Sequence, residues 1–340
     1  MRTRGCDKIR PCQLDVTNLT RIMLAFAVFD PHKYTVDIAD PQDDAYYLNL
    51  LSVAQNVNKT LHPNFRGVGI AVGGWSFSDE GPTHYAWSNM TSTKENRHTF
   101  VVSLGKLLEK YPFSSVELHW EWPGHQGRGG NPADAKNYIE LLRDMRALYN
   151  SNLRISVVLP AQYEYLKNMD VKGMENLVDW FTLLSFDLHR PWDQWIDGLG
   201  NKIKSHTDLA EVEYALELVK KSGVNPYKIT MGTANYGRGY TVKDPKCKYY
   251  GCEFTGPSKA GSCTKEDGLL SACEIDRIIN EKRLQPSIIY GGAEAKEISW
   301  DDQWVSYDDK EMLAKKRGLA NKHCLGGNAL WAIDYQVGDG

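Results

Sequence analysis

Three ionisable side chains alternate with apolar ones in the segment Ser115-Val-Glu-Leu-His-Trp-Glu121. Successive side chains of a β-strand point to opposite faces, so Glu117, His119 and Glu121 would share one face and the apolar residues the other. Burying three such groups without partners would cost several kcal/mol. The pattern therefore predicts that they pair with one another, with a ligand or with a metal ion.

Amide, carboxylate, guanidinium and aromatic side chains follow several other predicted strands. Sugars offer hydroxyl groups for hydrogen bonds and apolar faces for stacking, so this mixture predicts a carbohydrate cleft. Phosphate-binding loops of the GxGxxG or GxxxxGK type do not occur in the sequence. The residues in question are Trp75, Gln162, Tyr163, Phe186, Asp187, Tyr236, Arg238 and Trp331.

Short β-branched or apolar runs alternate with helical stretches along most of the chain. This order is typical of a parallel α/β architecture. In a barrel of that kind the active site forms at the carboxyl ends of the strands, and Glu121 ends one of them. The predicted strands are Arg21–Phe29, Val68–Gly74, Ser115–Glu121, Arg154–Pro160, Trp180–Asp187, Lys228–Tyr236 and Asn328–Asp334.

Two of the predicted helices have recognisable ends. The first covers Asn131–Tyr149, with Asn131 as its cap and an apolar stripe that reaches Leu148. The second runs from Asp208 to Lys221; Asp208 and Glu211 are spaced as in a capping box, and Gly223 lies past its end.

The last two predicted strands begin 100 positions apart, at Lys228 and Asn328, and four cysteines lie between them. We expect residues 240–304 to form a small inserted α+β subdomain and residues 1–239 and 305–340 to form the main domain. Disulfides would hold so small a unit together, because it can bury little apolar surface. The seven cysteines are Cys6, Cys12, Cys247, Cys252, Cys263, Cys273 and Cys324.

These cysteines show no CxxC spacing, which favours disulfides in an oxidising compartment over a zinc site, and leaves the pairing open. Three N-glycosylation triplets, at Asn18, Asn58 and Asn89, agree with that compartment. The sequence shows no secretory signal. We nevertheless expect a secreted, extracellular protein.

The composition excludes several classes of protein. A hydrophobic content of 42% and 10 Trp in 340 residues indicate a globular chain. With 40 basic and 43 acidic residues, the net charge of −3 provides no phosphate-binding face, so nucleic acid is not an expected partner. No apolar run reaches the roughly 18 residues of a membrane span. The 18 Tyr, 10 Trp and 9 Phe instead suggest surfaces on which sugars stack.

Five motifs, in order along the chain, resemble those of glycoside hydrolase family 18, the chitinases. The cysteine-bearing region from Cys247 to Cys263, followed by Gly268-Leu-Leu-Ser271, is most similar to the fungal-type members. The motifs are Ala71-Val-Gly-Gly-Trp-Ser76, Val116-Glu-Leu-His-Trp-Glu-Trp-Pro-Gly124, Ser185-Phe-Asp-Leu-His189, Tyr236-Gly-Arg238 and Leu330-Trp-Ala-Ile-Asp334.

The resemblance implies a (β/α)8 TIM barrel with an insertion between strand 7 and helix 7, and chitin or chito-oligosaccharide as the partner. It also implies a retaining mechanism in which the N-acetyl oxygen of the sugar attacks the anomeric carbon while a carboxylic acid protonates the leaving oxygen. We expect no cofactor, no metal and a monomeric protein.

The roles of individual residues follow from the same resemblance. Glu121 matches the general acid and base, and Asp187 matches the aspartate that helps to hold the acetamide and the acid. Trp331 matches the floor beneath the reacting sugar. Trp75 and Trp122 are expected to be further cleft aromatics, and Gln162, Tyr163, Phe186, Tyr236 and Arg238 to line the cleft.

The chain departs from the family pattern at two places that handle the acetamide. Where the family has DGxDxDxE, this chain has Ser114-Ser-Val-Glu-Leu-His-Trp-Glu121, so Glu117 and His119 replace two aspartates. A protonated His119 would repel the cationic intermediate and keep Glu121 ionised. The family motif MTYD has become Leu184-Ser-Phe-Asp187, which removes a tyrosine hydroxyl. We therefore expect weakened hydrolysis.

Two alternatives stay open. One is a catalytically inactive chitin-binding pseudoenzyme, a lectin or a subunit of a toxin-like assembly. The other is a metal site formed by Glu117, His119 and Glu121 with Asp187 and His189. Seven strands are predicted where the barrel needs eight, so we also expect the first strand and the last helix to be missing or truncated.

Overall fold

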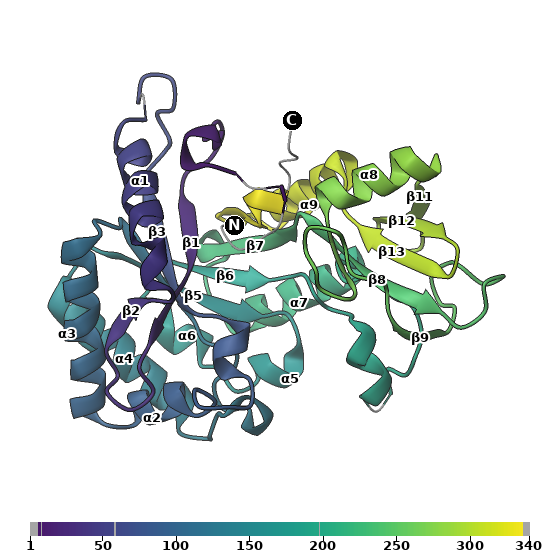
Figure 1. Cartoon of the computed structure of the whole chain (residues 1–340). Helices are drawn as coiled ribbons and strands as arrows, with labels where there is room; N and C mark the ends of the chain where they lie inside the picture. The colour runs from purple at the N-terminus through teal and green to yellow at the C-terminus, as the bar shows by residue number, and fades with distance from the viewer. Residues whose placement is uncertain (1–5, 8, 58, 197, 336–340) are drawn as a thin grey trace. The chain divides into compact units, whose positions relative to one another are not determined.

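The computed structural model describes residues 6–7, 9–57, 59–196 and 198–335 (Figure 1). The chain divides into two compact units. We call Arg10–Thr182 with Ser222–Lys228 the N-terminal unit, and Met1–Ile9, Leu183–Lys221 and Ile229–Gly340 the C-terminal unit. Each is described by itself.

The N-terminal unit is built on a sheet in the order β6-β5-β4-β3-β1-β2. Neighbouring strands from β1 to β5 run parallel, and the edge strand β2 is antiparallel to β1. All residues of β3 and β4 are buried. The strands are β1 (Ile22–Phe29), β2 (Val36–Ile38), β3 (Val68–Gly73), β4 (Ser115–His119), β5 (Arg154–Pro160) and β6 (Trp180–Leu184), the last of which passes into the other unit.

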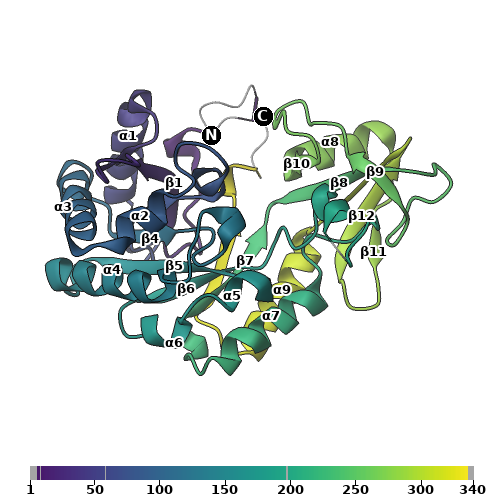
Figure 2. The same cartoon turned by 90° about the horizontal axis from the view of Figure 1, so that it is seen from below.

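Helices connect these strands, and α3 and α4 lie side by side along the sheet (Figure 2). The α-helices are α1 (Asp44–Gln55), α2 (Ala86–Ser92), α3 (Lys94–Lys110), α4 (Asp134–Tyr149), α5 (Tyr163–Leu166) and α6 (Val171–Met174). Short 3₁₀ turns are η1 (Pro11–Gln13), η2 (Pro41–Asp43), η3 (Trp75–Ser78), η4 (Gln126–Arg128) and η6 (Pro226–Lys228).

The two faces of the Ser115–Glu121 segment differ as the alternation predicted. Trp120 points toward the helices, where its ring stacks on Trp87 of α2 at 5.5 Å and packs against Tyr138 of α4. Aromatic packing of this kind buries a large apolar area and favours offset or edge contacts. The ionisable residues of the segment are therefore on the other side of the sheet.

The C-terminal unit contains the parallel pair β7 (Ile229–Ala234) and β14 (Gly327–Trp331) and a second, antiparallel sheet in the order β10-β8-β13-β12-β11, with β9 paired to β8. The strands of the second sheet are β8 (Tyr236–Val242), β9 (Phe254–Pro257), β10 (Leu269–Ser271), β11 (Ser287–Ile289), β12 (Ala295–Trp300) and β13 (Gln303–Tyr307). The helices are α7 (Leu209–Lys221), α8 (Ala272–Lys282) and α9 (Lys310–Lys322), with short turns η5 (Pro191–Trp195) and η7 (Ile333–Tyr335).

The second sheet has a core of its own, in which Tyr240, Phe254 and Trp304 pack together. Two disulfides fall in this region. Cys247 is bonded to Cys252, and Cys263 to Cys6 near the start of the chain. One of the expected disulfides, Cys247–Cys252, thus lies within the inserted region, whereas Cys263 is bonded to a residue outside it. The boundaries 240–304 stay a prediction.

All seven predicted strands occur, but all except β5 are shorter than expected. Strand β4 ends at His119, so Glu121 lies two residues beyond it, and β6 ends at Leu184, so Asp187 lies in the following loop. Tyr236 begins a new strand, β8, instead of ending β7. Glu121 and Asp187 thus lie outside the regular strand pairing, which an alternation pattern cannot reveal.

The predicted helix ends were partly wrong. Helix α4 begins at Asp134, because Asn131 uses its side chain in a turn to the amide of Ala133 and does not cap the helix. Leu148 of its expected apolar stripe is exposed. Asp208 does accept hydrogen bonds from the first amides of α7, but Glu211 binds His189 in place of completing a capping box.

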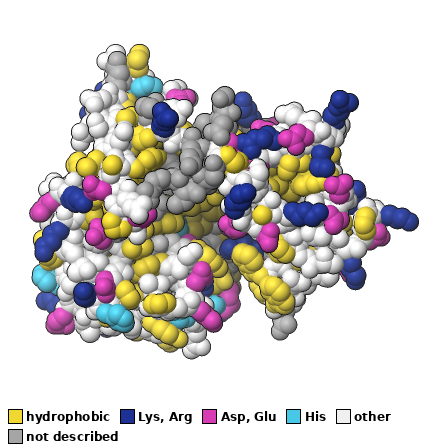
Figure 3. All heavy atoms as spheres, viewed as in Figure 1, with side chains coloured by type: hydrophobic (Ala, Val, Ile, Leu, Met, Phe, Trp, Pro, Cys, Tyr) yellow, Lys and Arg dark blue, Asp and Glu magenta, His cyan; other side chains and the backbone are white. Residues whose placement is uncertain are grey.

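The surface agrees with the composition. On the face drawn in Figure 3, basic and acidic side chains are interspersed without a large patch of one sign. Asn18 and Asn89 are exposed, and Asn58 lies outside the described residues. The two chain ends, where a first strand and a last helix were expected to be missing, also lie largely outside them. Among the described helices, none has the length and apolar character required to cross a membrane.

Candidate active site

Glu117, His119 and Glu121 form a buried chain of charged groups in the N-terminal unit. His119 Nε2 lies 2.8 Å from Glu121 Oε1, and His119 Nδ1 lies 3.7 Å from Glu117 Oε1. Glu117 is anchored further by hydrogen bonds from Ser156 of β5 at 3.0 Å and Thr182 of β6 at 2.6 Å. The three groups thus pair with one another, as one of the sequence alternatives proposed.

The imidazole at the centre of this chain is protonated at neutral pH. Burial opposes the charge, but the carboxylates of Glu121 and Glu117 outweigh it and raise the pKa of His119 to about 9. Burial likewise opposes the charge of Glu117, yet His119 and the hydroxyl groups of Thr182 and Ser156 lower the pKa of Glu117. His119 is consequently an imidazolium held between two carboxylates.

The loop after Glu121 is fixed by a buried carboxylate at the start of α4. Asp134 Oδ2 accepts hydrogen bonds from the amides of Gly124 at 3.0 Å and Asn131 at 2.8 Å and from the hydroxyl of Ser88 at 2.7 Å. Burial raises the pKa of Asp134. The backbone that carries Glu121 is therefore tied to the first turn of a long helix.

The aromatic residues predicted near Glu121 differ in exposure. Trp122 is only 3% exposed and its ring stacks on Tyr165 at 5.6 Å, so it is packed inside the N-terminal unit. Trp75 is half-buried at the start of η3, next to Gly74, whose amide donates to the carbonyl of His119 at 2.8 Å. Trp75 thus comes just after β3, and its neighbour Gly74 is bonded to the last residue of β4. The burial of Trp122, in contrast, is that of a core ring.

Gln162 and Tyr163 lie where β5 gives way to α5. Gln162 is the residue before the helix and is half-buried, while Tyr163 is 60% exposed. Their expected contact with sugar stays a prediction.

Asp187 is the centre of a second cluster, in the C-terminal unit. Its carboxylate accepts hydrogen bonds from Arg238 at 2.7 and 2.8 Å and from the hydroxyl of Tyr236 at 2.8 Å. Arg190 and His206 approach it at 3.7 and 3.5 Å. Burial would raise the pKa of Asp187, but the two arginines hold it well below its usual range. Asp187 is therefore an ionised group that holds Tyr236 and Arg238 in place.

Phe186 and Trp331 complete the predicted residues of this unit. Together with Tyr335 they pack against Ala234, Tyr236 and Leu269, and the rings of Phe186 and Tyr236 meet edge to face at 6.2 Å. Trp331 is the last residue of β14. The structure thus brings Phe186, Asp187, Tyr236, Arg238 and Trp331 together, although they come from different elements.

His189 does not join this cluster. Its Nδ1 lies 2.7 Å from Asp193, and its Nε2 lies 2.9 Å from Glu211, so both ring nitrogens are bound to carboxylates. Among the described residues, the group whose ligand atoms lie close enough for a metal is Cys6, Asp7 and Cys263, and its two sulfurs are bonded to each other. His189 is thus bound to carboxylates other than Asp187, and the metal alternative stays a prediction.

A model of the family described as glycosyl hydrolases family 18 matches residues 3–336 of the chain. The chain belongs to this family.

Two relatives of this family 18 chain are much longer proteins. Killer toxin subunits alpha/beta of Kluyveromyces lactis are 31% identical over 276 residues, which are 78% of this chain and 23% of that protein. Secreted chitinase LysM12 of Penicillium expansum is 26% identical over 285 residues, 78% of this chain and 19% of that protein. The chain thus spans about a fifth of each of these relatives.

Solved structures show the fold of the family 18 chain. The second catalytic domain of a group II chitinase from Ostrinia furnacalis superposes with a TM-score of 0.86 at 24% identity, over 98% of this chain and 87% of that one. Human YKL-39, described as a pseudo-chitinase with retained chitooligosaccharide binding, gives 0.82 at 20% identity, over 98% and 90%. The fold is the TIM-barrel fold of the chitinases with an insertion, as the sequence predicted.

Sequence reasoning missed several residues of these clusters in the family 18 chain. Ser156 and Thr182 lie on strands that were predicted, and the same alternation that groups Glu117 with His119 could have found them. His206, which approaches Asp187, carries no such signal because it lies in a loop between η5 and α7. Arg128, described below, was also missed.

Proposed function

We propose that this chain binds β-1,4-linked N-acetylglucosamine oligomers, with Glu121 in the position of the general acid, and that it hydrolyses them slowly or not at all at neutral pH. The observation that carries the proposal is the 2.8 Å contact between His119 and Glu121. The finer assignment of roles to Glu117, His119, Glu121 and Asp187 belongs to the same proposal.

The contact bears on catalysis because a general acid must carry a proton when the glycosidic bond breaks. The imidazolium of His119 engages Oε1 of Glu121 at 2.8 Å, so that oxygen is not available to deliver a proton to a leaving oxygen. The same positive charge would disfavour the cationic oxazolinium intermediate of a substrate-assisted mechanism. Both effects reduce turnover and neither prevents a sugar from binding.

Aromatic and polar side chains among the predicted site residues support the binding of an oligosaccharide. Trp75 in the N-terminal unit and Trp331 in the C-terminal unit would supply stacking surfaces, and Gln162, Tyr163, Phe186, Tyr236 and Arg238 would supply further contacts. The relatives include proteins named as chitinases, and the neighbouring structures include one of a chitinase variant with a chito-oligosaccharide. YKL-39 shows that this fold can retain oligosaccharide binding in a protein described as a pseudo-chitinase.

The test measures binding and turnover on one sample. Calorimetric titration with penta-N-acetylchitopentaose should give saturable binding, and a chromogenic chitobioside should be turned over slowly at pH 7. A Glu121→Gln variant should bind similarly. Fast turnover at pH 7 that disappears in Glu121→Gln would overturn the inhibitory role of His119, and an absence of binding would overturn the oligosaccharide-binding function.

A second candidate is an active chitinase. It is favoured by the cluster of Asp187, Tyr236 and Arg238, in which the carboxylate is ionised and fully hydrogen-bonded. The same turnover assay decides between the two candidates.

The place of action is a further part of the proposal. The disulfides Cys6–Cys263 and Cys247–Cys252 fit an oxidising compartment outside the cytosol, and one relative is named a secreted chitinase. Fractionation of cells that produce the full-length protein tests this assignment, and recovery in the cytosol with reduced thiols would contradict it.

A further inference from the structure

Arg128, at the end of η4, binds three separate parts of the N-terminal unit with one side chain. Its Nε donates to the backbone carbonyl of Glu121 at 3.0 Å, and its Nη2 donates to the backbone carbonyl of Trp75 at 2.5 Å. Nη1 pairs with Asp79 at 2.6 Å. The guanidinium carbon also lies 3.8 Å from the ring centroid of Trp75. The residue in the acid position and a predicted sugar-stacking ring are thus joined through Arg128.

The backbone places Arg128 rigidly. Gly129 has a φ of +71°, and a Cβ atom there would lie 1.8 Å from the carbonyl oxygen of His84, so only glycine fits. Its own carbonyl lies 3.0 Å from the hydroxyl of Ser88, whose single proton is shared with Asp134 at 2.7 Å. Arg128 therefore projects from a loop held against α2 and α4, not from a loosely packed segment.

The chemistry of arginine suits this position and that of lysine does not. A guanidinium offers five N–H donors in a fixed planar fork and stacks on aromatic rings, whereas an ammonium is a point charge without a flat face. Arg128 is buried, and its carboxylate partner Asp79 has a side chain that is 46% exposed. Burying the guanidinium costs desolvation free energy, which an exposed carboxylate and two carbonyls offset only in part. This cost suggests that Arg128 has a functional role in addition to packing.

We propose that Arg128 is the positioning residue of the oligosaccharide site: it holds the indole of Trp75 in a fixed orientation relative to the backbone of Glu121. The guanidinium occupies one face of the indole, so a sugar that stacks on Trp75 must use the opposite face. A sugar placed there would be aligned with Glu121 before any other contact forms. This inference rests on the proposed oligosaccharide binding.

The experiment measures the affinity for penta-N-acetylchitopentaose in the full chain. Arg128→Met removes the fork and the charge, and Arg128→Lys keeps the charge only. Both should weaken binding by about tenfold, the effect of losing one good interaction. A lysine variant with wild-type affinity would overturn the role of the fork.

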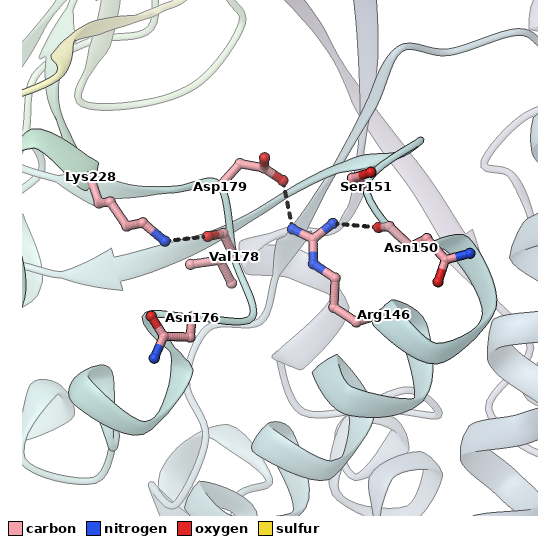
Figure 4. Close-up of a pocket in the computed structure, with 7 residues that line it drawn as sticks. All are labelled: Arg146, Asn150, Ser151, Asn176, Val178, Asp179 and Lys228. Carbon is pink, nitrogen blue, oxygen red and sulfur yellow. Dashed lines mark hydrogen bonds and ion pairs between the residues drawn. The ribbon is translucent and has the colours of Figure 1, made fainter.

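Arg146 provides a matched control (Figure 4). It comes from α4 and likewise donates to backbone carbonyls, those of Leu177, Leu153 and Asn150, and to Asp179. It lines a polar pocket with Ser151, Asn176, Val178 and Lys228, none of which is a predicted site residue. Arg146→Met should lower thermal stability as Arg128→Met does, but leave the affinity within about twofold of the wild type. Equal losses of affinity in both variants would mean that Arg128 acts only through stability.

A double-mutant cycle with Trp75→Ala separates positioning from simple packing. If Arg128 acts through the ring, Arg128→Met should weaken binding much less in the Trp75→Ala background than in the wild type. The same fold-change in both backgrounds would overturn the proposal. If the wild type binds the oligosaccharide, Trp75→Ala weakens that binding and Arg128→Met does not, the Arg128 inference alone is wrong. If the wild type does not bind at all, both the proposed function and the inference are wrong.

Discussion

Nε2 of His119 lies 2.8 Å from Oε1 of Glu121, so the residue in the acid position is bound to an imidazolium. A carboxylate at position 119, as in the family pattern, would carry the opposite charge. The exchange therefore places a positive group beside Glu121 where the family pattern has a negative one.

Restoring the family residues at both altered positions should therefore raise turnover. We expect the double variant His119→Asp with Phe186→Tyr to hydrolyse a chromogenic chitobioside at least about tenfold faster. One group that stabilises a developing charge is worth roughly 10²–10³ in rate, and the restored groups need recover only part of that. Adding Glu121→Gln to this variant should remove the gain. An unchanged rate in the double variant would show that the acetamide-handling groups are not the defect.

The pKa of His119 predicts a pH-dependent stability. A pKa raised from 6.5 to about 9 on folding contributes stability that is fully present below pH 6.5 and lost as the pH rises through 9. In urea unfolding, the free energy of unfolding of the wild type should fall by up to about 3 kcal/mol between pH 6 and 9.5. The His119→Gln variant should not show this decrease. The pKa of His189 is also raised to about 9, but this contribution is present in both proteins and cancels. If the free energy of unfolding changed with pH in the same way in both proteins, the ion pair between His119 and its carboxylates would be refuted.

Asp187 and Glu266 both bind Arg238 but should differ in importance. Asp187→Asn leaves Arg238 buried without its main counter-charge and should lower the free energy of unfolding by about 3 kcal/mol or more. Glu266 is 59% exposed and lies 3.2 Å from the guanidinium, so Glu266→Gln should cost under about 1 kcal/mol. Chemical denaturation of the two variants at pH 7 measures the difference, and similar losses would contradict the assignment of Asp187 as the central carboxylate.

The two disulfides should contribute unequally to stability. Cys6 and Cys263 are 257 residues apart in the sequence, whereas Cys247 and Cys252 are five apart. In the chain-entropy model the longer loop restricts the unfolded state more, by about 3 kcal/mol. Cys6→Ser should therefore lower the melting temperature more than Cys247→Ser. The reverse order would indicate that local packing outweighs loop entropy here.

Local patterns predicted much of the fold. The seven strand segments and the two-faced alternation of Ser115–Glu121 follow from side-chain period, which depends on neighbours in the sequence. The positions where β4 and β6 end could not be predicted in this way. Glu121 and Asp187 lie beyond the regular strand pairing, and Asp187 contacts residues of another element, β8. The capping box at Asp208 failed for the same reason, since Glu211 binds His189 from another loop.

The candidate site was predictable by residue type and less so by contact. Glu117, His119 and Glu121 were grouped correctly from spacing alone. The hydroxyls of Ser156 and Thr182 that hold Glu117 lie 39 and 65 residues away from it. Alternation within each strand could have marked these two residues, but it does not show that both meet Glu117. Arg128 was missed because an arginine that binds backbone carbonyl oxygens in a loop produces no periodic pattern in the sequence.

Asp134 couples the opening of the loop after Glu121 to the unfolding of the first turn of α4. One carboxylate oxygen receives the amide protons of Gly124 and Asn131, so neither amide can meet solvent until that oxygen is released. Deuterium exchange at the two positions should then follow a single opening event, in which the first turn of α4 unfolds. The mobility of the backbone beside the acid is thus governed by the fraying of a helix end.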